Sequence, residues 1–395
     1  MPDTSLARKI SLPLLTFYGL GTILGAGIYV LIGEVSLRAG QYAPLSFIVA
    51  SCIAGITAYS FARLSSMFPK SAGEAAYAFE AFNNRSVSSL VGIAVVLIGT
   101  VSAATMIKGF AGYFIVLLQV PEPIVIIGII ILITVFAIWG ISQSLIIASC
   151  ITIIEVLGLL FVIYAVIDLN ELKNYSLPES NSILPNSTVI LYAAFISFYA
   201  YIGFEDIVNI AEETINPTKI VPLAITLSLV FSTFLYIALS TSCTIFIPAS
   251  VFNTSSAPLV SIVEYKGYNP LIIALVSMIA IINGALVQLI MASRVLYGMA
   301  EQKLFLPIFK SVNTKTHTPI LATVTIAAIL MILVTIFDLL TLAEFTSAIT
   351  LIIFIVVQTS LLYLSIQKHS KNKFDFILPI FGITLNFILL IFGFS

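Results

Sequence analysis

Long, nearly uninterrupted apolar segments recur along the whole chain, and they constrain the fold more than any other feature of the sequence. A bilayer core requires about 20 consecutive apolar residues per spanning helix, and the cost of unpaired backbone amides excludes irregular structure there. Eleven segments meet this condition, and none alternates in polarity as the strands of a membrane barrel would. The sequence therefore predicts an all-α integral membrane protein. The expected spans are 12–36, 43–67, 88–119, 123–141, 144–167, 188–211, 222–247, 269–298, 319–337, 342–366 and 374–393.

The composition argues against several other classes of protein. Of the 395 residues, 60% are hydrophobic and 9% are charged, whereas soluble domains carry about 25% charged residues. The formal net charge is −1, so we expect the lipid bilayer rather than nucleic acid as a partner. The three cysteines stand singly in apolar runs, and the two histidines lie outside the spans. We therefore expect no metal site, no organic cofactor and no intramembrane enzyme.

The basic residues indicate how the chain is oriented in the membrane. The spans are threaded alternately, and nearly all of the 17 Lys and Arg residues then fall on the side of the N-terminus. Arg38, Lys173 and Lys266 fall on the other side, and Lys108 lies within a span. Because cytoplasmic loops collect Lys and Arg, we expect a multi-pass protein of the cell (inner) membrane with a cytoplasmic N-terminus. The Lys108 side chain is expected to reach the headgroups, and attraction of an anionic substrate is the alternative.

Two of the predicted spans are interrupted near their centres. In the first span, residues 18–29 read Tyr-Gly-Leu-Gly-Thr-Ile-Leu-Gly-Ala-Gly-Ile-Tyr, and in the sixth, residues 198–206 read Phe-Tyr-Ala-Tyr-Ile-Gly-Phe-Glu-Asp. Glycine in mid-helix costs about 1 kcal/mol relative to alanine and lets the backbone unwind, although close helix packing also explains such glycines. Interruptions at the first and sixth positions are typical of transporters built from two inverted five-helix repeats. Unwound helix ends expose N–H groups that suit a carboxylate and carbonyls that suit an ammonium, so facing breaks suit a zwitterion.

Several separated segments resemble the amino acid-polyamine-organocation (APC) superfamily, in particular its bacterial amino acid permeases. They include Gly25 to Tyr29, the loop Phe68 to Tyr77, and Tyr199 to Glu205 with its cytoplasmic exit, together with Asn283-Gly-Ala, residues 292–300 and Thr318-Pro319. The resemblance implies a LeuT-like fold in one transmembrane domain, 1–395. The first repeat would span 12–167 and the second 188–366, with an additional helix at 374–393. It further implies uptake of a small-molecule substrate, an amino acid, by alternating access.

The resemblance also implies where the substrate is held. Backbone groups of the first break would bind the substrate carboxylate, and carbonyls of the second break would bind its amino group. Tyr199 would close over the substrate from the outer side, and Glu205 would gate the inner pathway, whereas we expect Asp206 to be a surface charge. The implied binding residues are Ile23, Gly25, Ala26, Gly27, Tyr199, Ala200 and Ile202.

Glu155 is the ionisable residue that bears most directly on mechanism. It stands near the centre of the fifth span, where a charge costs about 2.5–3.5 kcal/mol. Burial there favours the neutral form, which allows a proton to be taken up and released during a cycle. We therefore hypothesise that Glu155 couples transport to H+; a buried structural hydrogen bond and a sodium ligand are the alternatives. The favoured function is therefore proton symport of an amino acid. Exchange of one amino acid or amine for another, and sodium symport, are the alternative functions.

Overall fold

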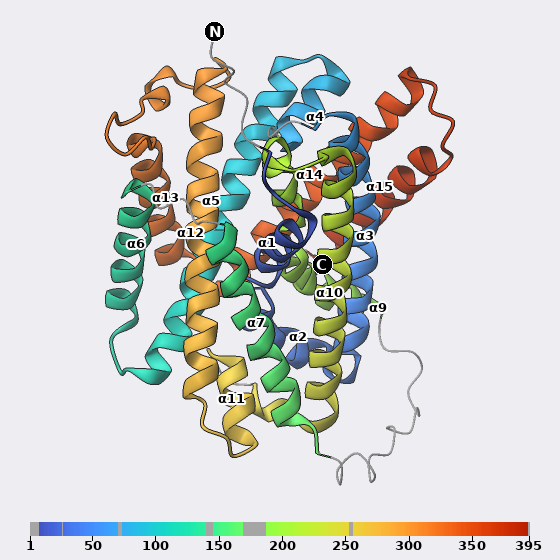
Figure 1. Ribbon diagram of the computed structural model, residues 1–395. Helices are drawn as coiled ribbons and strands as arrows, with labels where there is room; N and C mark the ends of the chain where they lie inside the picture. The colour runs from blue at the N-terminus through green and yellow to red at the C-terminus, as the bar shows by residue number, and fades with distance from the viewer. Residues whose placement is uncertain are drawn as a thin grey trace.

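The computed structural model describes residues 8–25, 27–69, 73–139, 145–168, 187–252 and 256–393, and within these it is a bundle of helices (Figure 1). Among the described residues, 9 helices are long and apolar enough to cross a membrane, and two further apolar helices are shorter. Large apolar side chains on the outside, such as Ile124, Ile131 and Trp139, are more than half exposed. Such a surface suits lipid rather than water. The predicted all-α, multi-pass membrane fold is confirmed.

Each expected apolar span coincides with helix in the structure, and the ends differ by a few residues. The largest difference is at α10, which begins at Pro217 instead of residue 222. Asn216 before it has φ 46°, and proline is favoured in a first helical turn, so the helix includes a polar first turn that hydropathy alone misses.

The elements of the first half are α1 (Leu12–Leu24), α2 (Gly27–Ala39), the 3-10 helix η1 (Gly40–Tyr42), α3 (Ala43–Met67), α4 (Gly73–Phe82), α5 (Arg85–Leu117), α6 (Glu122–Trp139) and α7 (Leu145–Val166). Those of the second half are α9 (Ser187–Phe198), η2 (Tyr199–Tyr201), η3 (Phe204–Glu213), α10 (Pro217–Phe246), η4 (Ala249–Val251), α11 (Pro258–Tyr265), α12 (Leu271–Glu301), η5 (Pro307–Lys310), α13 (Ile320–Ile336), α14 (Leu339–Gln367) and α15 (Phe374–Phe392).

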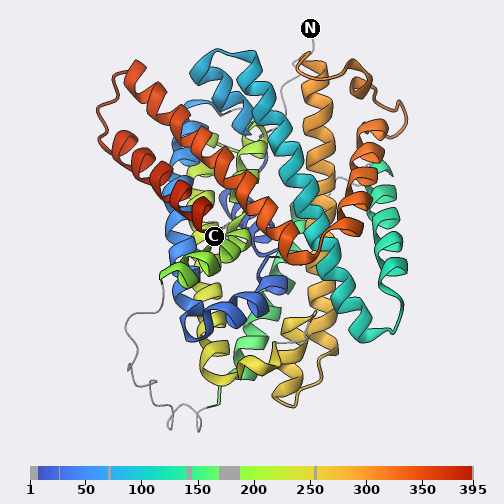
Figure 2. The same ribbon diagram turned by 180° about the vertical axis from the view of Figure 1, so that it is seen from behind.

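The packing of these helices places the interrupted spans in the middle of the bundle. Helix α5 packs along α12, and α3 packs along α10. The short helix α1 lies between α10 and α7, while α9 lies against α3 (Figure 1). At one edge α6 and α13 cover α5 and α12, and at the opposite edge α15 covers α14 and α3 (Figure 2). The breaks are therefore enclosed by protein, where irregular backbone is tolerated in a membrane.

Candidate functional site

The first interrupted span is a helix break between α1 and α2. Helix α1 ends at Leu24, and the Gly25 N–H still donates to the Gly21 carbonyl at 3.0 Å. Gly25 then leaves the helical conformation, with φ 0° and ψ −96°, and α2 begins at Gly27. Ala26, one of the residues expected to bind substrate, lies outside the described residues. The glycine cluster therefore marks a real break in the helix, as the sequence predicts.

The second interrupted span breaks between α9 and η3. After α9 the chain forms one 3-10 turn, η2, and Ile202 is extended, with φ −64° and ψ 138°. Gly203 has φ 123°, which favours glycine, and η3 begins directly after it. The Gly203 N–H donates to Glu205 Oε2 at 2.8 Å, so Glu205 satisfies a backbone group that the break leaves free. The gating role expected for Glu205 stays a prediction.

The two breaks are in direct contact with each other. A Cβ atom added to Gly203 would lie 2.5 Å from the Thr22 carbonyl oxygen, and one added to Gly27 would lie 2.4 Å from Ala200 Cα. The Thr22 hydroxyl lies 2.9 Å from the carbonyl oxygens of both Gly203 and Gly19, which share its single proton. Glycine is therefore required on each side of this contact, because any side chain would separate the two backbones.

Tyr236 of α10 joins the two breaks through one hydroxyl group. Its oxygen lies 2.9 Å from the carbonyl oxygens of both Ile23 and Ala200, which share its single proton. The Tyr236 ring packs edge-on against Tyr201, with 5.1 Å between the ring centroids. Sequence reasoning missed Tyr236, because nothing distinguishes it from the other tyrosines of the apolar spans.

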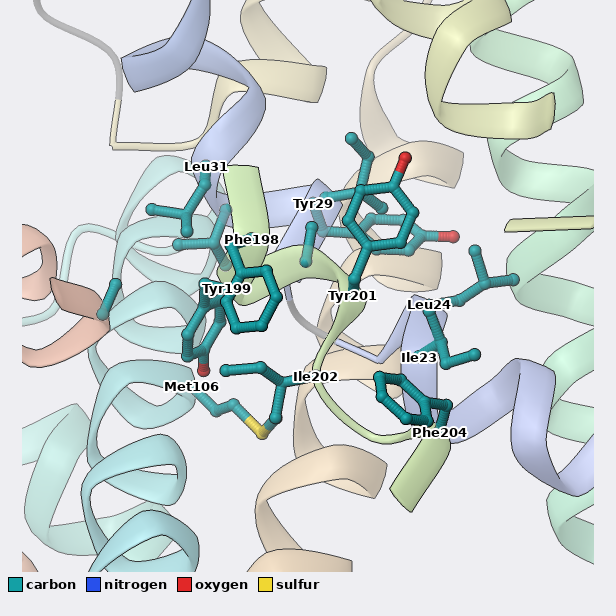
Figure 3. Close-up of a cluster of buried hydrophobic side chains, with 14 of the residues drawn as sticks. Ile23, Leu24, Tyr29, Leu31, Met106, Phe198, Tyr199, Tyr201, Ile202 and Phe204 are labelled. Atoms are coloured by element: carbon teal, nitrogen blue, oxygen red, sulfur yellow. The ribbon is translucent and has the colours of Figure 1, made fainter. Parts of the chain in front are cut away.

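The expected binding residues that the structure describes gather around this junction. Figure 3 shows Ile23 on one side and Tyr199 and Ile202 on the other, in one buried cluster with Met106. The Tyr199 hydroxyl lies 3.2 Å from Ser102 Oγ, so the Tyr199 side chain reaches across to α5. The structure thus brings the two sets of residues together; their binding and gating roles stay predictions.

Glu155 lies on α7 beside this junction and is fully buried. Neither of its carboxyl oxygens has a hydrogen-bond partner among the described residues. Its backbone carbonyl accepts a hydrogen bond from the Tyr29 hydroxyl at 2.7 Å, and its carboxyl interacts electrostatically with Tyr29 and Tyr236. A buried carboxyl without a partner is poorly tolerated as an anion, which favours its neutral form.

Two pockets lie next to the breaks, and Gln288 of α12 lines both. The first, which we call the path pocket, has an empty volume of about 360 Å³ and is bordered by Thr22, Met106 and Asn283. The second, which we call the acidic pocket, has an empty volume of about 320 Å³. Glu74, Glu205, Asp206, Gln288 and Thr350 supply its polar groups.

Two polar residues differ in their surroundings from what the sequence suggested. Asp206 is 5% exposed and accepts a hydrogen bond from Gln288 Nε2 at 3.3 Å, so the expectation of a surface charge was wrong. The tight 3-10 winding of η3 turns Asp206 inward, towards α12. Glu74 is also buried, and its place in the acidic pocket was not foreseen.

Lys108 forms an ion pair with Glu122 at the start of α6, with 3.0 Å between Nζ and Oε1. The Lys108 side chain is 20% exposed and the Glu122 side chain is 48% exposed. This pairing at the end of the bundle favours the structural reading of Lys108 over a role in attracting substrate.

Comparison of the whole sequence with known proteins identifies the family of the chain. A family model described as amino acid permease matches residues 10–395. The chain belongs to the amino acid permease family. The predicted resemblance to the APC superfamily is thereby confirmed, and the family is named for permeases rather than for enzymes.

Relatives of this permease carry several different substrate names. Cationic amino acid transporter 4 of Mus musculus is 29% identical over 392 residues, covering 93% of this chain and 61% of that protein. The methylthioribose transporter of Bacillus subtilis (strain 168) is 28% identical, covering 95% of this chain and 85% of that protein. The branched-chain amino acid permease of the same organism is 26% identical, covering 81% and 73%. The chain thus spans about three fifths of the length of the cationic amino acid transporters that it matches.

Proposed function

We propose that this permease takes up amino acids across the cytoplasmic membrane by alternating access. The substrate would bind where the two helix breaks meet, with its carboxylate at the first break and its ammonium at the second. The observation that carries the proposal is the junction of Ile23, Ala200 and Tyr236, where two carbonyl oxygens from different breaks share one hydroxyl donor. A substrate ammonium supplies three donors, so it is chemically equipped to take over the Ala200 carbonyl of the second break.

The arrangement of helices supports two five-helix repeats, 12–167 and 188–366. Exchanging the two halves pairs α3 with α10, α5 with α12, α6 with α13 and α7 with α14. Under this exchange the contact of α1 with α10 becomes that of α9 with α3, and the contact of α5 with α13 becomes that of α12 with α6. Both members of each pair of contacts are present. This is the relation expected of a LeuT-like repeat. Helix α15 would then be the additional helix. We keep the N-terminus on the cytoplasmic side in this proposal.

We assign coupling to the proton and the coupling role to Glu155. Its burial and its lack of a hydrogen-bond partner support reversible protonation, and its contact with Tyr29 connects it to the outer half of the first broken helix. A sodium ion bound by the Glu155 carboxylate is the competing explanation, because a carboxylate is also a ligand for hard cations.

The test is uptake of labelled amino acids into sodium-free proteoliposomes with an acidic exterior. We expect accumulation driven by the pH gradient, loss of that accumulation in Glu155→Gln, and no change in the control Glu264→Gln, an exposed carboxylate of α11. Uptake that appears only with a preloaded lumen and survives Glu155→Gln would replace symport by exchange. Uptake that requires a sodium gradient would assign the site to sodium.

A further inference from the structure

The acidic pocket holds three carboxyl groups, none of which has a basic partner among the described residues. Glu74 comes from α4, and Glu205 and Asp206 come from η3; all three are at most 7% exposed. The other elements that line the pocket, α5, α12 and α14, contribute apolar side chains and the polar groups of Gln288 and Thr350. None of the described residues that line the pocket is Lys or Arg.

The hydrogen bonds of the pocket leave buried polar groups unsatisfied. Asp206 accepts from Gln288 Nε2, and Glu205 accepts from the Gly203 N–H. The Gln288 Oε1 atom and the Thr350 hydroxyl are buried and have no partner among the described residues. An ionised carboxylate can only accept, whereas a protonated carboxyl supplies an O–H donor. Protonation of the pocket would therefore provide a further donor, which the free Gln288 Oε1 acceptor could use.

The electrostatics of the pocket point the same way. Asp206 repels both Glu74 and Glu205. Among the described residues no group of three or more His, Cys, Asp or Glu side chains is placed to hold a metal ion. Like charges in a shared buried site are relieved when one group binds a proton. We propose that the acidic pocket is a proton-binding site, shared by Glu74 and Asp206 and separate from Glu155.

The position of this site connects it to the transport path. Gln288 lines both the acidic pocket and the path pocket, so a change in the charge of Asp206 acts on a side chain of the path. Helix α4 begins directly on η3, since a Cβ atom added to Gly73 would lie 2.9 Å from Asn209 Oδ1. Ionisation of both Glu74 and Asp206 would push α4 away from η3. This consequence for transport rests on the proposed function, whereas proton binding does not.

Other titratable groups surround the pair and shape its protonation. Tyr77 of α4 interacts electrostatically with Glu74, and Tyr18 of α1 interacts with both Asp206 and Arg294 of α12. Burial, and to a smaller extent the charge of Asp206, raises the pKa of the Glu74 carboxyl from 4.5 to about 7. The pocket therefore changes charge near neutral pH.

Difference infrared spectroscopy tests the site without requiring transport. The purified full chain with Glu155→Gln, which removes a buried carboxyl outside the pocket, is titrated through neutral pH while the carbonyl band of neutral carboxylic acids is followed. We expect a band that disappears as the pH rises, loses intensity in Glu74→Gln, and titrates at lower pH in Asp206→Asn because a neighbouring negative charge is gone. Glu301→Gln, an exposed carboxylate at the end of α12, should leave the band unchanged.

Two results would overturn the proposal. One is that the infrared band of a neutral carboxylic acid is absent at every pH from acidic to neutral. The other is that this band is present but is altered by neither Glu74→Gln nor Asp206→Asn. If Glu74→Gln does not fold, Glu74→Asp serves in its place, and a titration midpoint identical to that of the unsubstituted Glu74 would count against the site. The infrared titration does not measure uptake. It therefore tests the acidic pocket even if proton symport through Glu155 proves wrong.

Discussion

Replacing Tyr236 by Phe tests whether the two helix breaks are joined as the structure shows. The substitution keeps the ring that packs on Tyr201 and removes the one hydroxyl shared by the Ile23 and Ala200 carbonyls. A buried carbonyl left without its donor costs about 1–3 kcal/mol. We expect the free energy of unfolding to fall by about this amount, since the last carbonyls of α1 have no partner within the helix. The conformation with joined breaks is disfavoured by the same energy, and 1.4 kcal/mol corresponds to about a tenfold change in population.

The assay pairs thermal unfolding of the purified protein with initial rates of amino acid uptake in proteoliposomes. Tyr201→Phe is the matched control, because Tyr201 is equally buried. Its hydroxyl donates at 3.2 Å to the Phe47 carbonyl of α3, which belongs to neither break. We expect both variants to lose stability and only Tyr236→Phe to lose about tenfold in uptake. Equal uptake by Tyr236→Phe and the native protein, or an equal loss in both variants, would refute the reasoning.

Three further predictions concern other parts of the molecule. The buried Glu74 carboxyl has a pKa raised to about 7, so the folded state holds a proton that the unfolded state has lost, and stability should fall as pH rises from about 4.5 to about 7. Thermal unfolding measured across this pH range should show the fall in stability in the native protein and should not show it in Glu74→Gln. Gly203→Ala should abolish uptake, because a Cβ atom would lie 2.5 Å from a carbonyl oxygen of α1, whereas Gly128→Ala, in open space, should transport normally. Arg63→Leu should lower the free energy of unfolding by about 2 kcal/mol, because it removes the charged partner of the buried Asp375 and leaves that carboxylate only neutral donors such as Tyr59, and Arg63→Leu with Asp375→Leu should recover part of the loss.

The spans and the two breaks could be predicted from the sequence because the bilayer imposes them locally. A run of apolar residues must be helical in lipid, and clustered glycines or an isolated Gly203 before acidic residues mark where such a helix unwinds. These signals require no knowledge of the neighbouring helices. The predicted ends therefore differ from those in the structure by a few residues, and by most where a polar first turn begins α10.

The partners at the site could not be predicted, because they come from distant parts of the chain. Tyr236 meets Ile23 across 213 residues, and only the packing of α10 against α1 brings them together. Asp206 was misplaced because its direction depends on the 3-10 winding of η3, which hydropathy does not reveal. Glu74 lies in the segment 68–77, which resembles other permeases, yet its burial depends on the contact of α4 with η3.

The kinds of interaction differ between the breaks and the frame around them, and this difference indicates which parts move. The breaks are joined by neutral hydroxyl-to-carbonyl bonds from Thr22 and Tyr236, each with a net contribution of about 1 kcal/mol. By contrast, Arg63 of α3 holds Asp375 of α15 with two parallel bonds of 2.8 Å, a charge-assisted pairing of greater strength. A substrate ammonium can compete with the neutral bonds, because its own bonds to carbonyl oxygens are charge-assisted. Substrate binding is therefore expected to exchange contacts at the breaks while α3 and α15 keep their relative position.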